Sequence, residues 1–135
     1  MTDLNKYDEI QSISAELSGY RKGSLTVFID LEKGYLTWRE STRWCNDFTR
    51  TITSEQIQAI RSDIEACRLL NWHSMRLPPI AEGNTDIPQQ SRLVWHVRIN
   101  LNGKSWLREG VNRLPTQWEA FCAAIERISR TSFRL

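Results

Sequence analysis

Cysteine, histidine and long apolar runs are scarce in this chain of 135 residues. The cysteines, Cys45, Cys67 and Cys122, are odd in number and lack C-x-x-C spacing, so we expect reduced thiols and no disulfide framework. The histidines, His73 and His96, have no cysteine at ligand spacing, so we expect no metal site. No apolar run approaches the roughly 20 residues that a helix needs to span a bilayer, so we expect no membrane partner.

Basic runs are equally rare, because no stretch of Lys and Arg exceeds two residues and the net charge is only +2. The charge is uneven, since residues 91–135 hold 8 Lys/Arg and 3 Asp/Glu. That bias could attract an acidic partner or nucleic acid, or it could be a solvated surface. Residues 1–6 have neither a basic start nor an apolar segment, which predicts a cytoplasmic, bacterial-type protein.

Catalytic and cofactor-binding motifs are also missing. Gly103-Lys104-Ser105 resembles the end of a phosphate-binding loop, but Arg98 stands where the first glycine is required. The sequence has no Gly-x-Ser-x-Gly elbow and no paired-histidine metalloprotease helix, and we expect no cofactor. A Cys45 nucleophile with a histidine base is conceivable, although Cys45 is equally a small side chain at the end of a hairpin.

Hydrophobic periodicity predicts an α+β fold. Alternating residues indicate strands near 13–17, 24–31, 35–40, 47–52, 92–101 and 104–111. A capping box of Thr53 and Gln56 predicts a helix that ends near Leu70, and Thr116 with Glu119 predicts a second. We expect an antiparallel sheet of four to six strands with two helices packed on one face, in a single domain over 1–135. The long Pro-containing loop 76–90 is either a mobile excursion or a binding loop.

The hairpin over residues 91–111 carries the clearest candidate site. Asn102-Gly103 suits a type I′ turn, which sets His96 opposite Glu109 and Arg98 opposite Leu107. A carboxylate beside a histidine can serve acid–base chemistry or an anion site, but it is also an ordinary cross-strand pair. The same register puts Arg108 on the core side, so Arg108 must extend to an edge or a bulge must shift the strand.

Tryptophan is abundant, with six residues. Periodicity places Trp95, Trp106 and Trp118 in the core, while Trp38, Trp44 and Trp72 lie near element ends. With Arg39, Arg43, Tyr35 and Arg50 nearby, this second group could form a binding surface for single-stranded bases or a protein partner. Partial burial at a sheet edge is the alternative.

The segment 110–121 has the pattern Gly-x-Asn-x-x-Pro-x-x-Trp-x-x-Phe, in which Gly110, Asn112, Pro115, Trp118 and Phe121 are the defining residues. After a Trp-containing strand and an Asn-Gly hairpin, this pattern resembles one that recurs in small uncharacterised bacterial α+β proteins. The resemblance implies the fold and a cytosolic or envelope-associated bacterial origin, and it implies no activity.

These features favour a small non-enzymatic binding or accessory domain that acts through protein interaction, of which a toxin-neutralising immunity protein would be one instance. Self-association is a further option, because Val94, Leu107 and Val111 share the sheet face away from the helices. The alternatives are a nucleic-acid-binding module that uses the Arg and Trp surface, and an enzyme or anion binder that uses His96 and Glu109.

Overall fold

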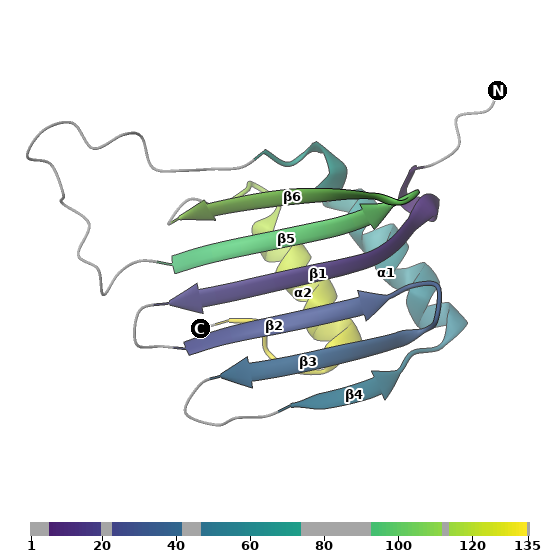
Figure 1. Cartoon of the computed structure of the whole chain (residues 1–135), viewed down its shortest axis with the longest axis horizontal. Helices are drawn as coiled ribbons and strands as arrows, with labels where there is room; N and C mark the ends of the chain where they lie inside the picture. Colours follow the sequence, from purple (N-terminus) through teal and green to yellow (C-terminus); the bar gives the residue numbers. More distant parts are fainter. Residues whose placement is uncertain (1–5, 20–22, 42–46, 74–92, 112–113, 135) are drawn as a thin grey trace, which may run out of the picture.

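A computed structural model describes residues 6–19, 23–41, 47–73, 93–111 and 114–134. Six antiparallel strands form one sheet in the order β4-β3-β2-β1-β5-β6, and both helices lie on one face of it (Figure 1). This arrangement confirms the α+β prediction. The elements are β1 (Ile10–Gly19), β2 (Gly23–Asp30), β3 (Tyr35–Ser41), β4 (Phe48–Thr51), α1 (Ser54–Ala66), β5 (Leu93–Leu101), β6 (Lys104–Val111) and α2 (Trp118–Ser129).

The first strand is longer and more central than its short apolar pattern indicates. β1 pairs with β2 on one side and with β5 on the other, so it joins segments about seventy residues apart in the chain. Its apolar side chains Ile13, Ala15 and Leu17 are buried, and the residues between them point to the opposite face. The N-terminal half of the sheet and the C-terminal hairpin therefore meet at β1.

The turns of the sheet follow their sequence signals. Asn102 and Gly103 have φ values of 51° and 78°, the positive angles of a type I′ turn, which confirms the predicted hairpin. In the β2–β3 turn, the Asp30 carboxylate accepts bonds from the backbone N–H groups of Glu32 and Lys33 at 3.0 and 2.7 Å. Gly34 completes that turn with a φ of 77°.

The two helices begin differently. The α1 capping box is confirmed, because Thr53 Oγ1 accepts from the Gln56 backbone and the Gln56 side chain accepts from the Thr53 backbone. At α2 the capping-box prediction was wrong: Gln117 is the N-cap residue and it makes no side-chain capping bond. The Trp118 N–H donates to the Pro115 carbonyl, so Thr116 lies within a turn and not at the helix boundary.

The ends of the helices are set by backbone conformation. α1 ends at Ala66, earlier than the predicted Leu70, because Arg68 adopts a left-handed φ of 54°. α2 stops in the same way, with Arg130 at a φ of 59°. Among the described residues, no helix is both long and apolar enough to cross a membrane. The predicted loop 76–90 lies outside the described residues.

Aromatic side chains fill the core between the sheet and α2. Trp118 lies 5.6 Å from Trp95 of β5 and 6.0 Å from Trp72, measured between ring centroids. Phe121 of α2 and Phe133 of the tail complete the cluster, and Phe133 is fully buried. The C-terminal tail therefore packs back onto the core.

Replacing Phe133 by Ala tests this packing. A fully buried Phe that becomes Ala costs about 3–5 kcal/mol, because the apolar transfer energy is lost and a cavity remains. We expect the free energy of unfolding, measured by urea titration, to fall by that amount. Phe28→Ala is the matched control on the opposite sheet face, where Phe28 is half-buried, and we expect it to cost about 1 kcal/mol. Equal losses for the two variants would contradict a docked tail.

Candidate functional site

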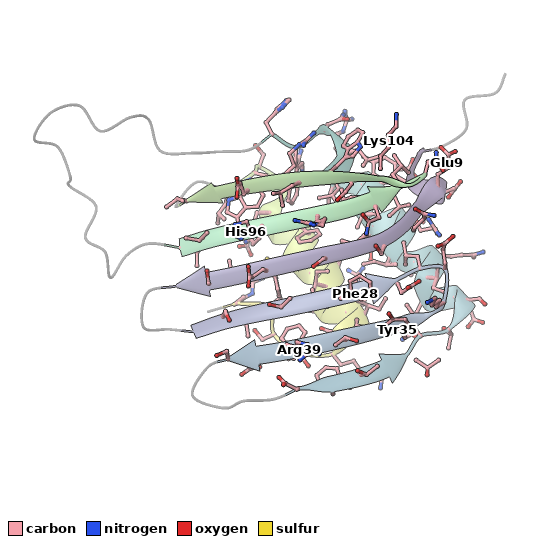
Figure 2. The ribbon with its side chains drawn as sticks, in the orientation of Figure 1. Glu9, Phe28, Tyr35, Arg39, His96 and Lys104 are labelled. Carbon is pink, nitrogen blue, oxygen red and sulfur yellow. The ribbon has the colours of Figure 1, made fainter. Side chains whose placement is uncertain are left out.

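The candidate site lies on the face of the sheet that no described helix covers, which we call the open face. Strand alternation sends the apolar side chains to the helices and leaves a polar, hydroxyl-rich set on the open face. Figure 2 views this face, with Phe28, Tyr35, Arg39 and His96 spread across it. The open face is therefore the largest surface of the sheet that partners can reach.

Strand pairing arranges the open face in rows that cross the strands. One row runs from β3 to β6 through Arg39, Thr26, Glu16, His96 and Glu109. The next row runs from β4 to β6 through Thr49, Thr37, Phe28, Ser14, Arg98 and Leu107. The charged side chains thus gather towards β1, β5 and β6.

The centre of this gathering is His96. Its Nε2 atom lies 3.1 Å from Oε1 of Glu109 on β6, so the predicted pair is within hydrogen-bond reach. Its Nδ1 atom is covered from solvent and lies 3.4 Å from Oε1 of Glu16 on β1, an ion-pair distance without hydrogen-bond geometry. The imidazole therefore sits between carboxylates from the strands on either side of its own.

This arrangement limits what His96 can do chemically. A neutral imidazole carries one N–H and a charged imidazole carries two, so only the charged form can donate to Glu16 and Glu109 together. In either form, both ring nitrogens face side chains of this protein. Neither nitrogen is directed at a substrate, so the geometry serves cohesion between three strands better than acid–base chemistry.

A hollow of about 620 Å³ lies over these strands. Its floor combines hydroxyl and amide groups with the charged cluster, and Phe28 and Leu107 supply apolar walls. The lining residues are Ser14, Glu16, Thr26, Phe28, His96, Arg98, Asn100, Leu107 and Glu109. Arg98 lines the hollow and is exposed.

The hairpin register that builds the site is the predicted one. His96 pairs with Glu109, Arg98 with Leu107 and Val97 with Arg108, so no bulge shifts β6. Arg108 extends to the sheet edge, where its Nε donates to the Trp72 carbonyl at 2.7 Å. Its guanidinium also lies 5.3 Å from the ring centroid of Trp106, which is half-buried. This guanidinium occupies part of the outer edge of β6 and protects it from pairing with another strand.

The predicted tryptophan surface does not form as expected. Trp38 is fully buried and Trp72 is 4% exposed, so neither side chain can contact a ligand. Their indole N–H groups donate to Glu40 and to the Cys67 carbonyl, which satisfies the polar atom of each ring. Trp44, Arg43 and Cys45 lie outside the described residues. Sequence position near an element end was a poor guide here, because both rings are covered by elements distant in the chain.

A second hollow, of about 570 Å³, lies between α1, α2 and β4 and was not anticipated from the sequence. Arg127 of α2 forms an ion pair with Asp63 of α1 across it. Arg50 of β4 donates to the Ser129 carbonyl at 2.8 Å. These arginines join elements of the protein to one another, so we assign the hollow a structural role.

The remaining predicted candidates have ordinary surroundings. His73 is exposed, and Cys67 and Cys122 are buried free thiols. Burial raises the pKa of the Cys122 thiol to about 12, and burial also raises the pKa of Cys67. Both thiols are therefore poor nucleophiles. No cluster of three His, Cys, Asp or Glu residues suited to a metal ion occurs in the described parts of the chain.

No family model, no curated protein and no solved structure matches the chain. Inferences about function therefore depend on the geometry of the open face.

The raised pKa of Cys122 predicts a loss of stability at alkaline pH. The unfolded thiol ionises near pH 9.0, whereas the folded thiol holds its proton until about pH 12. Between these values the unfolded state loses protons first, so the free energy of unfolding falls as pH rises, by up to about 1.4 kcal/mol per pH unit. Urea titrations from pH 8 to 10.5 should show a shallower decline for Cys122→Ala. If the free energy of unfolding falls equally steeply with pH in both proteins, the buried Cys122 thiol is not the cause of the decline.

Proposed function

We propose that this chain is a non-enzymatic protein-interaction domain that binds its partner through the open face. The observation that carries the proposal is the one-sided cover of the sheet. Both helices pack on one face, and the other presents a broad surface formed by all six strands. The charged and aromatic side chains on that face are groups that a partner can contact.

The composition of the open face supports a protein partner. Phe28 and Tyr35 form an aromatic pair with ring centroids 5.9 Å apart, and Arg98 and Leu107 are exposed across the hollow from Phe28. Tyr, Phe and Arg are enriched where proteins bind one another. The shallow hollow between these groups can accept side chains of a partner.

An enzymatic role has less support. The Nε2 atom of His96 lies against Glu109 and its Nδ1 atom is covered from solvent beside Glu16, so neither nitrogen is open to a substrate as a general base requires. The hollow lies on an open sheet face, whereas small-molecule sites bury most of their ligand. His96 and Glu109 are better explained as part of a charged binding surface.

A nucleic-acid-binding role is also less well supported. Binding to phosphates requires a surplus of positive charge on one surface. The open face offers Arg39 and Arg98 against the carboxylates of Glu16, Asp30 and Glu109. Its charges are therefore mixed, and the tryptophans Trp38 and Trp72, expected to stack on bases, are buried.

Quantitative affinity capture from a lysate of the source organism tests the proposal. Tagged wild-type protein should retain a stoichiometric protein partner after nuclease treatment and a high-salt wash. Arg98→Glu should reduce the retained amount about tenfold, because it reverses an exposed charge within the proposed interface. The partner identified by mass spectrometry should then bind the purified domain in calorimetry with the same difference.

Lys33→Glu is the matched control, because it makes the same change of charge in the exposed β2–β3 turn. We expect it to retain the partner as the wild type does. Equal retention by Arg98→Glu and Lys33→Glu would contradict binding through the open face, and so would a monomeric chain that retains no stoichiometric partner.

A further inference from the structure

The charges along one row of the open face are separated by sign. The row starts with Arg39 on β3 and continues through Thr26 to Glu16, His96 and Glu109 on the far side of the sheet. Its positive group therefore lies at one end and its carboxylates lie at the other. A surface with this pattern is complementary to itself when it is turned through a half-turn.

Both ends of the row keep charge that a second surface can reach. The Glu16 side chain is 44% exposed, and it approaches His96 at an ion-pair distance without hydrogen-bond geometry. Arg39 is exposed, and it forms no ion pair with any residue that the structure describes. A complementary partner would supply a cation to Glu16 and a carboxylate to Arg39.

The neighbouring row shows a second separation of the same kind. Arg98 lies on β5 and Phe28 lies on β2 of this row, and Phe28 forms a ring pair with Tyr35 of β3. A guanidinium is attracted to the face of an aromatic ring when the two are brought within about 6 Å. Arg98 and the ring pair are thus also suited to meet across an interface between two identical faces.

We propose that the open face binds the open face of a second copy of this chain, across a two-fold axis that runs parallel to the strands between β1 and β2. This inference rests on the proposed function and names the partner as the chain itself. The axis reverses the strand order, so β3 of one copy lies over β5 of the other. Arg39 then lies over His96 of the same row in the second copy, with the carboxylates of Glu16 and Glu109 on either side of it. Arg98 lies over β3 of the second copy, beside the ring pair.

The size of the open face suits this assembly. Strands spaced about 4.8 Å apart and rows spaced about 6.8 Å apart give a face of roughly 650 Å² per copy. Two such faces bury roughly 1,300 Å² in total, which is within the range of stable, specific interfaces. Stacked sheets also pack with their strands nearly aligned, as this axis requires.

A charge-swap experiment tests the dimer. We expect light scattering and sedimentation to show a dimer of the wild-type chain that weakens as salt increases. Arg39→Glu and Glu16→Lys should each weaken dimerisation about a hundredfold, because both symmetric contacts become repulsive. A mixture of the two variants should restore the dimer, since the carboxylate introduced at position 39 of one chain can then pair with the ammonium group introduced at position 16, on the strand next to His96, of the other.

Recovery in the mixture also shows that each variant is folded. Lys33→Glu and Glu32→Lys make the same two changes of charge in the exposed β2–β3 turn, and they should dimerise as the wild type does. The inference would be overturned if Arg39→Glu and Glu16→Lys both dimerise as strongly as the wild type, or if the mixture of the two variants stays monomeric.

The outcomes separate this inference from the proposed function. A monomeric chain that captures a different protein through Arg98 would overturn the dimer and leave the interaction role intact. A monomeric chain with no partner would overturn both.

Discussion

Packing of the aromatic cluster against one face of the sheet is the interaction on which the rest of this structure depends. Trp95 from β5 and Trp118 and Phe121 from α2 meet in a buried cluster, and Phe133 of the tail covers its side. These rings bury a large apolar area and hold the helices to the sheet. Because they all point to one face, the polar residues that alternate with them are presented together on the other.

As a consequence, the two faces of the sheet have different roles, one in stability and the other in the proposed binding. The covered face supplies stability through Trp38, Val27, Ile29 and their neighbours, which are fully buried. The open face contributes less to stability, because its cross-strand pairs are partly exposed and each is worth about 0.2–1 kcal/mol. Residues there can be chosen for binding without loss of the fold. The contacts of His96 with the carboxylates on either side add cohesion between the strands and leave Arg98 exposed beside them.

Sequence reasoning succeeded where the determining contacts are local. The Asn102-Gly103 turn sets the register of β5 and β6, so the pairing of His96 with Glu109 followed from the residues between them. The capping box of Thr53 and Gln56 was likewise predictable from the sequence, because the two residues are three positions apart. The α2 cap failed for a related reason: Pro115 starts a turn that moves the helix start past Thr116.

The parts that could not be predicted depend on contacts between distant segments. Glu16 reaches His96 only because β1 pairs with β5, and no local signal chooses β5 over the other strands as its neighbour. The burial of Trp38 and Trp72 depends in the same way on the docking of Phe133 and α2. The candidate site was therefore recognised as a pair in sequence, and it became a three-strand cluster only in the folded sheet.

That third strand changes the interpretation of the site. A histidine with one carboxylate partner keeps a nitrogen for chemistry, which is how such pairs serve as acid–base groups. In this cluster Nε2 of His96 lies against Glu109 and Nδ1 is covered from solvent, so neither nitrogen is open to a ligand, but the carboxylate of Glu16 stays partly exposed on the surface. On an open sheet face such a carboxylate attracts a cation from outside. Arg39 of the same row has the matching charge but lies across the intervening strands, at the other end of the row. Within one chain these groups stay separated, and a second surface is what can bring them together.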